Sequence, residues 1–328
     1  MAIQTKQIHK ELRLAGRILR LGPKVMSPRM LRLSNRFLDT FAAGHALTRK
    51  SLYRQTFIAR PDGTRLRLAI YAPRKPQAHQ AGMLWLHGGG YAIGVPEIDV
   101  HFANMMTELG CVVVMPDYTR STEAPYPAAF DDCCMALRWL RDHAAELHVD
   151  DDQLFVGGDS AGGGLAAAVC LHARDQGDVA VAAQFPLYPM LDDRPTATNA
   201  DNDAPVWNTA ANVPAWQMYL QGVKDVPAYA APARCKDLAG MPPAMSFVGS
   251  IDPFLAETTA YMEGLQAAGI ETCFQVFDGC FHGFDIIFGH TKVGKHARLL
   301  FRNCVAYARR YFRKPQPKGA DADHQEMR

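Results

Sequence analysis

Short apolar segments alternate with helical patterns through most of this chain of 328 residues. The apolar segments that we expect to be strands are residues 83–87, 111–115, 154–158, 181–185, 245–249 and 272–277. The main helical patterns among and after them are residues 128–147, 161–175, 254–268 and 291–313. Strands that are apolar throughout and separated by helices are typical of a parallel sheet with both faces covered. The sequence therefore predicts an α/β fold.

Four segments do not fit this alternation. Residues 1–50 have the pattern of two helices, and residues 54–72 have the pattern of a hairpin around a Pro-Asp-Gly turn. Residues 192–232 are rich in Pro, Asn and Asp, fit no βα unit and predict an insertion above the sheet. The tail after Lys314 is expected to be disordered because it is polar and lacks periodicity.

Composition excludes several classes of protein. Apolar residues make up 48% of the chain and charged residues 21%, which excludes an intrinsically disordered protein. No window of about 18 apolar residues is present, so no integral membrane segment is expected, and the N-terminus lacks the apolar region of a secretory signal. The eight cysteines form neither a disulfide framework nor a zinc-binding spacing. We therefore expect reduced thiols, a cytoplasmic location, no metal and no cofactor.

Basic residues are concentrated at the two ends of the chain. Residues 1–50 carry 11 Lys and Arg against 2 Asp and Glu, and residues 292–328 carry 10 against 3, although the net charge is +2. Such ends can contact anionic membranes or nucleic acid, but solvated faces of terminal helices give the same pattern. No nucleic-acid motif accompanies them, so we favour solvated helix faces and expect no nucleic-acid partner.

Two glycine-containing motifs predict nucleophilic catalysis. The motif GDSAG at residues 158–162 lies directly after an expected strand and directly before a helical pattern. This context is typical of a nucleophile elbow, in which small residues flank a serine on a sharp turn. The motif HGGG at residues 87–90 follows another expected strand, and the amides of such a loop can approach a developing oxyanion closely. Ser160 is therefore the expected nucleophile.

Asp252 and His282 each follow an expected strand, where the loops of an α/β sheet converge on one site. A serine hydroxyl is a weak nucleophile at neutral pH, so an imidazole must accept its proton, and His282 fits that role. A buried carboxylate holds the required tautomer of the imidazole, and Asp252 fits that role. The sequence therefore predicts a Ser-His-Asp triad.

These motifs together closely resemble the hormone-sensitive-lipase-like group of α/β-hydrolases, which includes bacterial acetyl esterases. The resemblance is carried by HGGG, by GDSAGG, by Asp252-Pro253 and by His282-Gly283-Phe284. It extends from about residue 54 to residue 313. It implies the α/β-hydrolase fold, a mostly parallel and doubly covered sheet with a helical cap.

The resemblance also assigns site residues and domains. It implies a catalytic triad of Ser160, Asp252 and His282. It also implies an oxyanion hole made of Gly88, Gly89, Gly90 and Ala161. His87 is expected to hold the glycine loop by hydrogen bonding. The implied division is cap helices at residues 1–50, a catalytic domain at residues 51–191 and 233–314, a cap insertion at residues 192–232 and a disordered tail at residues 315–328.

The chain departs from the group's pattern in places beside the triad. Residues 119–123 are TRSTE where the group usually has a sequence close to RLAPE. Gly164 stands where Asn is frequent, and Ala256 replaces a second acid after Asp252. These changes leave the predicted triad untouched but leave the pocket shape and the substrate open.

We expect a serine carboxylesterase that hydrolyses short-chain acyl esters, from acetyl to about hexanoyl, through an acyl-enzyme intermediate. The same triad serves amide or formamide hydrolysis, which is the main alternative. A hydrolase-fold binding protein is a further alternative, disfavoured because the triad is complete. The expected partner is a small-molecule ester, and the sequence leaves a homodimer open.

An apolar stripe runs through residues 1–50 and consists of Ile8, Leu12, Leu19, Leu33, Phe37, Leu38 and Phe41. Burying a Leu or Phe side chain contributes about 1.5–3 kcal/mol, so such a stripe is expected to cover another surface. The open mouth above Ser160 is the expected partner. We therefore favour a lid over the acyl pocket, with membrane attachment as the alternative.

Trp207, Trp216 and Tyr219 of the insertion either line this pocket or pack the cap on the body.

Overall fold

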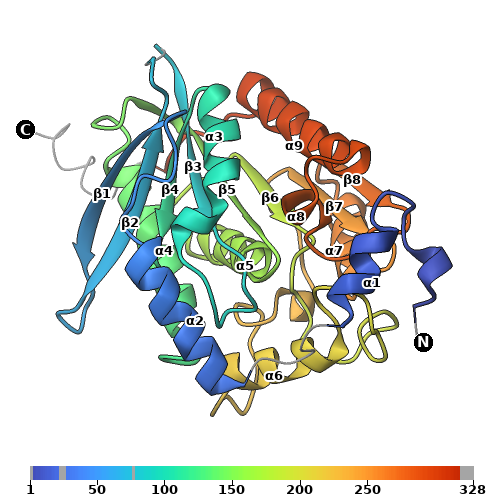
Figure 1. Ribbon diagram of the computed structural model, residues 1–328. Helices are drawn as coiled ribbons and strands as arrows, with labels where there is room; N and C mark the ends of the chain where they lie inside the picture. The colour runs from blue at the N-terminus through green and yellow to red at the C-terminus, as the bar shows by residue number, and fades with distance from the viewer. Residues whose placement is uncertain (1–2, 22–26, 76–77, 318–328) are drawn as a thin grey trace, which may run out of the picture.

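The computed structural model describes residues 3–21, 27–75 and 78–317 (Figure 1). The strands are β1 (Leu52–Ala59), β2 (Arg65–Ala72), β3 (Gln80–Leu86), β4 (Cys111–Pro116), β5 (Val149–Asp159), β6 (Ala183–Leu187), β7 (Ala244–Gly249) and β8 (Thr272–Phe277). The α-helices are α1 (Arg13–Leu19), α2 (Pro28–Phe41), α3 (Val100–Glu108), α4 (Ala128–Asp142), α5 (Ala161–Gln176), α6 (Thr209–Tyr219), α7 (Leu255–Ala267), α8 (Phe284–Ile287) and α9 (Lys292–Tyr311). Short 3₁₀ helices occupy Thr5–Gln7, Pro96–Asp99 and Pro232–Arg234.

The strands form one eight-stranded sheet in the order β1-β2-β4-β3-β5-β6-β7-β8. The hairpin strands β1 and β2 pair antiparallel, β2 pairs antiparallel with β4, and every later pairing is parallel. Because the parallel strands end at the same edge of the sheet, the loops after β3, β5, β7 and β8 can meet there. The predicted α/β fold with a mostly parallel sheet is confirmed.

Helices cover both faces of the sheet, as Figure 1 shows. On β3, Leu84 and Leu86 face the layer that contains α4, α5 and α7, whereas Met83 and Trp85 face the layer that contains α3 and α9. This alternation follows from the two-residue period of a strand. A strand buried on both faces must be apolar throughout, which is why the apolar segments predicted the sheet correctly.

The expected burial of the whole N-terminal stripe is wrong. Ile8 and Leu12 are buried in the core, but Leu33, Phe37 and Phe41 of α2 are exposed. The helix instead turns a partly polar side to the body, where Asn35 donates from Nδ2 to the Ala92 carbonyl at 2.9 Å. Polar contacts with distant segments therefore decide which side of α2 faces inward.

Two further features bear on the predicted organisation of the chain. Of the predicted disordered tail, residues 315–317 are described, and Gln316 exchanges hydrogen bonds with Ala180 there. The rest of the tail, residues 318–328, lies outside the described part of the chain. Among the helices that the structure describes, none combines the length and the apolar character needed to cross a membrane.

Arg67 of β2 joins the sheet to the segment before α3 and to the segment after β4. It donates from Nη2 to Glu97 Oε2 at 3.1 Å and to Asp117 Oδ2 at 3.0 Å. Glu97 also accepts hydrogen bonds from the Gly44 amide at 3.0 Å and from the Tyr53 hydroxyl at 2.9 Å. Burial raises the pKa of Glu97, but the hydrogen bonds and charge of Arg67 outweigh this effect and hold the pKa below its usual value. The ionised carboxylate therefore stabilises the fold.

We predict that Glu97→Gln lowers the free energy of unfolding at pH 7 by about 2–3 kcal/mol, because a buried, hydrogen-bonded charge is removed. The folded pKa is depressed, so this deficit should shrink as the pH falls through that pKa. Urea titrations at several pH values measure both effects. The control Glu108→Gln removes an exposed ion pair with Arg302 and should cost less than about 1 kcal/mol. Equal losses in the two variants would contradict this account.

Candidate active site

Ser160 lies on a sharp turn between β5 and α5. Its backbone has φ 57° and ψ −121°, a conformation that non-glycine residues rarely adopt. A Cβ on Gly162 would lie 2.0 Å from the Leu86 carbonyl oxygen, so a side chain at this position would force the turn away from β3. The Ser160 amide donates to the Leu187 carbonyl at 2.9 Å, which ties the turn to β6. The predicted elbow context, a strand followed by a turn and a helix, is present.

The structure brings the three predicted triad residues together. His282 Nε2 lies 2.8 Å from Ser160 Oγ, and His282 Nδ1 lies 2.8 Å from Asp252 Oδ2. All three side chains are buried. The other Asp252 oxygen, Oδ1, accepts a hydrogen bond from the Phe254 amide at 2.9 Å. A hydroxyl bonded to an imidazole that is itself bonded to a carboxylate can lose its proton as it attacks a carbonyl carbon.

Aromatic rings surround the His282 imidazole. The ring centroids of Tyr188, Phe254 and Trp207 lie 5.0, 5.1 and 6.2 Å from that of His282. Such contacts restrict the orientation of the imidazole and limit its access to water. Sequence reasoning singled out Trp207 but missed Tyr188 and Phe254, because isolated aromatic residues after strands carry no recognisable pattern.

The glycine loop after β3 follows the predicted arrangement in part. The Gly88 amide donates to Asp159 Oδ1 at 3.1 Å, so it is already used within the protein. Gly89 and Gly90 have φ values of 120° and 59°, and a Cβ on Gly90 would lie 2.4 Å from the Trp207 ring. His87 Nδ1 lies 2.8 Å from the Gly88 carbonyl oxygen, which confirms the expected hydrogen bond between this histidine and the loop.

Two buried carboxyl groups lie behind this loop, and sequence reasoning missed their pairing. Asp159 and Asp99 are hydrogen-bonded to each other, and Asp99 also accepts a hydrogen bond from the Trp85 indole at 2.9 Å. Burial raises the pKa of both groups, and the charge of Asp99 raises the pKa of Asp159 further. Two carboxyl groups can bond to each other only if one holds a proton. Asp159 therefore holds the Gly88 amide while it lies against Asp99.

A cavity of about 270 Å³ opens beside the glycine loop. Its walls come from the loop, from the start of α2 and from α6 with the preceding segment, and consist of Ser27, Pro28, Leu31, Gly89, Gly90, Ala92, Ile93, Val206, Trp207, Ala211, Pro214, Ala215 and Met218. Trp207 connects this cavity to the triad, since its ring also lies beside that of His282. Trp216 and Tyr219 are buried in the main core, so they pack the insertion on the body.

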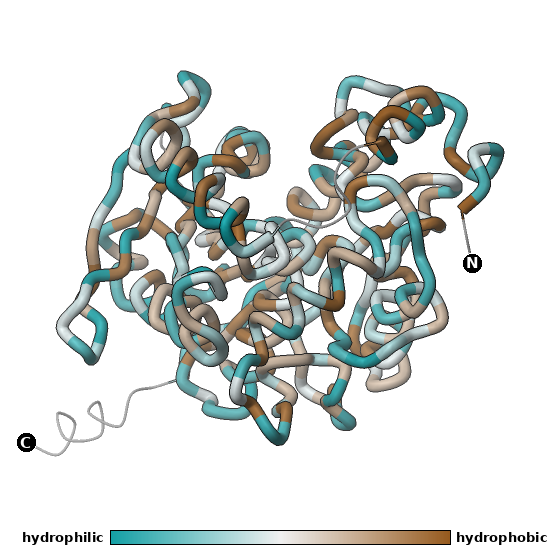
Figure 2. The backbone as a smooth tube through the Cα atoms, turned by 60° about the horizontal axis from the view of Figure 1, so that its bottom comes forward, coloured by the Kyte–Doolittle hydropathy of each residue, from teal (hydrophilic) through white to brown (hydrophobic). Residues whose placement is uncertain are grey.

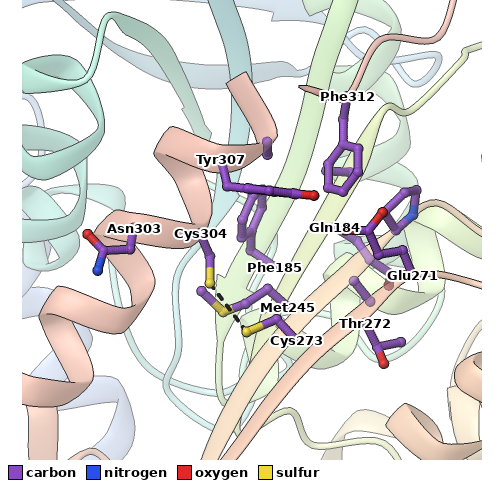
Figure 3. A pocket seen from close by; sticks show the side chains of 14 residues that line it. Gln184, Phe185, Met245, Glu271, Thr272, Cys273, Asn303, Cys304, Tyr307 and Phe312 are labelled. Carbon is purple, nitrogen blue, oxygen red and sulfur yellow. Dashed lines mark hydrogen bonds between the residues drawn. The ribbon is translucent and has the colours of Figure 1, made fainter. Parts of the chain in front are cut away.

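A second cavity, of about 320 Å³, lies between α9 and the strands β6, β7 and β8 (Figure 3). Phe185 and Met245 form part of its apolar wall. Cys273 of β8 and Cys304 of α9 face each other there, with their sulfur atoms 3.5 Å apart. Its lining includes neither the triad, nor the glycine loop, nor Trp207, so this cavity is separate from the site at Ser160. Within the described residues, no group of three His, Cys, Asp or Glu side chains is arranged to hold a metal ion.

Comparison with known proteins identifies the family. Residues 83–286 match a family model described as alpha/beta hydrolase fold. The chain belongs to this family. The predicted α/β-hydrolase fold and the resemblance to the hormone-sensitive-lipase-like group are thereby confirmed.

Individual relatives of this hydrolase are esterases. Esterase LipI of Mycobacterium tuberculosis is 36% identical, over 65% of this chain and 67% of its own length. Carboxylesterase NlhH of the same species is 32% identical, over 64% of this chain and 68% of its own length. Among solved structures, a bacterial heroin esterase superposes with a TM-score of 0.84 at 30% identity, covering 93% of this chain and 98% of its own. The predicted enzyme class, a carboxylic ester hydrolase, is confirmed.

Asp285 of this hydrolase carries a buried carboxyl group three residues after His282. Burial raises the pKa of Asp285 to about 6, although the neighbouring Tyr188 hydroxyl opposes the rise. A raised pKa means that the folded state binds the proton more tightly than the unfolded state does. The resulting stabilisation is complete below the unfolded pKa of about 3.9 and is lost as the pH rises through about 6.

We predict that Asp285→Asn removes this pH dependence, because an amide does not titrate. The free energy of unfolding of the variant minus that of the natural chain should be about 3 kcal/mol more favourable at about pH 7 than at about pH 4. Chemical denaturation at the two pH values measures the difference. Asp142→Asn, at a half-exposed position, is the matched control and should show no such gain. A constant difference between Asp285→Asn and the natural chain would contradict the prediction.

Proposed function

We propose that the protein is a serine carboxylesterase that hydrolyses short-chain acyl esters, from acetyl to about hexanoyl. The single observation that carries this proposal is the chain of two 2.8 Å hydrogen bonds from Ser160 through His282 to Asp252. The esterase relatives support an ester in place of an amide. Amide or formamide hydrolysis, which the same triad could perform, has no separate observation in its favour.

In the first half of the reaction, Ser160 Oγ attacks the ester carbonyl carbon while its proton passes to His282 Nε2. The tetrahedral intermediate then collapses, and His282 returns the proton to the leaving alcohol. The product of this half is an acyl group esterified to Ser160. Asp252 holds the imidazole and stabilises its protonated form throughout.

The oxyanion is bound in this proposal by the amides of Gly89, Gly90 and Ala161. Gly88 is left out of the predicted set because its amide donates to Asp159. Ala161 is the first residue of α5, and the first amides of a helix have no partner within the helix and carry a positive potential. Each such donor contributes about 3 kcal/mol to stabilising the transition state.

In the second half, a water molecule attacks the acyl group while His282 accepts its proton. Collapse of the second intermediate breaks the bond to Ser160 Oγ, which recovers a proton from His282. One ester and one water thus give one alcohol and one carboxylic acid, and the enzyme returns to its initial state.

The size and lining of the 270 Å³ cavity support a small apolar acyl group. Leu31 comes from α2, and Met218 comes from α6. We therefore assign residues 1–50 and 192–232 to a cap over the catalytic domain. A cytoplasmic location also belongs to the proposal, supported by eight cysteines that are all free in the structure. A homodimer stays a prediction.

We predict that Ser160→Ala and His282→Ala each lower kcat for p-nitrophenyl acetate by about 10⁵-fold or more, while Asp252→Asn leaves more residual activity. The nucleophile and base act as a unit, so the double variant should be no worse than either single variant. Steady-state kinetics with anilides in parallel measure these losses and the preference for esters. Ser51→Ala, outside the site, is the control. Turnover by Ser160→Ala at the natural rate would refute the mechanism.

We predict that Met218→Ala and Leu31→Ala shift the preference toward longer acyl chains, because each enlarges the cavity that we assign to the substrate. The ratio of kcat/KM for octanoate to that for acetate should rise by about tenfold, since one methylene changes discrimination by about 1–3 kcal/mol. A series of p-nitrophenyl esters measures the profile. Leu299→Ala, on the exposed side of α9, should leave it unchanged. An unchanged profile in both cavity variants would contradict the assignment.

A further inference from the structure

Helix α2 exposes a row of large apolar side chains, which we call its outer face. It consists of Met30, Leu33, Phe37 and Phe41, which are 44%, 69%, 62% and 63% exposed. Their spacing of three or four residues places them on one side of the helix. The rings of Phe37 and Phe41 lie 4.7 Å apart, so the row is continuous. A contiguous exposed apolar surface of this kind is typical of an interaction site.

The contacts of the opposite side hold α2 in this orientation. Asn35 donates to the Ala92 carbonyl, and Asp39 accepts from Arg120 at 2.8 Å. Leu31, also on this side, lines the 270 Å³ cavity. Rotating α2 to bury its outer face would break these contacts and open the cavity. The outer face is therefore available to a partner while the helix stays in place.

Positive charge lies directly beside the outer face. Arg29, Arg32 and Arg36 are exposed and follow one another at intervals of three and four residues, so they form a row along the same helix. In the part of the chain that the structure describes, none of the three guanidinium groups has an ion-pair partner. The carboxylate nearest in sequence, that of Asp39, is paired with Arg120. The surface therefore combines apolar side chains with uncompensated cations.

We propose that the outer face of α2 docks on an anionic phospholipid surface. An amphipathic helix with large apolar side chains and adjacent arginines binds at the membrane interface, where the apolar groups enter the acyl boundary and the cations contact phosphates. A second copy of this chain fits less well, because a two-fold interface would bring the same unpaired arginines together. Figure 1 shows α2 and α6 along the lower side of the molecule, and Figure 2 turns this side forward.

Docking would also place the substrate cavity near the lipid. Pro28 and Leu31 of α2 line that cavity, so docking through the outer face would bring the cavity to within one helix of the membrane surface. An apolar ester dissolved in the bilayer could then enter without crossing bulk water. This consequence rests on the proposed esterase function, whereas the docking itself does not.

Vesicle co-sedimentation of the full chain tests the proposal. We expect binding to vesicles of phosphatidylcholine mixed with phosphatidylglycerol, weak binding to phosphatidylcholine alone, and loss of binding at high salt. The triple variant Arg29→Gln, Arg32→Gln, Arg36→Gln should bind about 100-fold more weakly. The triple variant Leu33→Ser, Phe37→Ser, Phe41→Ser should lose binding as well. Leu299→Ser with Tyr311→Ser, on the exposed side of α9, is the matched control and should bind as the natural chain does.

The circular dichroism spectrum and the melting temperature show whether each variant is folded, and both should be unchanged in the α2 variants. Failure of the natural chain to bind anionic vesicles would overturn the proposal, as would equal binding by the folded α2 variants. A dimer in analytical ultracentrifugation that Leu33→Ser, Phe37→Ser, Phe41→Ser dissociates would identify a second copy as the occupant and also overturn it. Vesicle binding is measured without turnover, so these results are independent of whether the proposed catalysis is correct.

Discussion

The strained turn at Ser160 is the constraint on which the rest of the site depends. A positive φ at a residue with a side chain costs of order 1–3 kcal/mol and persists only when the surroundings hold it. Here Gly158 and Gly162 let the turn press against β3, where any Cβ would collide with the Leu86 carbonyl. The same turn directs Oγ at His282 and places the start of α5 beside the glycine loop. One backbone conformation thus positions both the nucleophile and one candidate oxyanion donor.

Buried acids behind the site show that this arrangement is maintained at a cost. Asp99, Asp159 and Asp285 are all buried, and burial raises the pKa of each. Apolar side chains of similar size would stabilise such a core better, because a buried carboxyl group loses its hydration. What Asp159 provides is direction, since it orients the Gly88 amide through a bond that an apolar residue cannot make. The site is therefore built for geometry more than for stability.

The sequence predicts this molecule well where local patterns are decisive. The strands and the elbow could be found because burial on two faces and a tight turn each restrict the residues that fit. The pairing of Asp99 with Asp159 could not be predicted, because no sequence pattern links residues sixty positions apart. The predicted orientation of α2 was wrong because polar contacts decide which side of the helix faces the body. Asn35 and the ion pair of Asp39 with Arg120 make these contacts, and the spacing of apolar residues does not reveal them.

The central claim is that hydrolysis proceeds through a covalent bond to Ser160. A p-nitrophenyl alkylphosphonate tests it most directly, because attack by the nucleophile releases p-nitrophenol but the phosphonylated enzyme does not turn over. Peptide mass spectrometry after titration should place one phosphonyl group per chain on Ser160, with esterase activity falling in proportion to the label. A label on another residue, or full esterase activity in protein labelled completely at Ser160, would contradict the account.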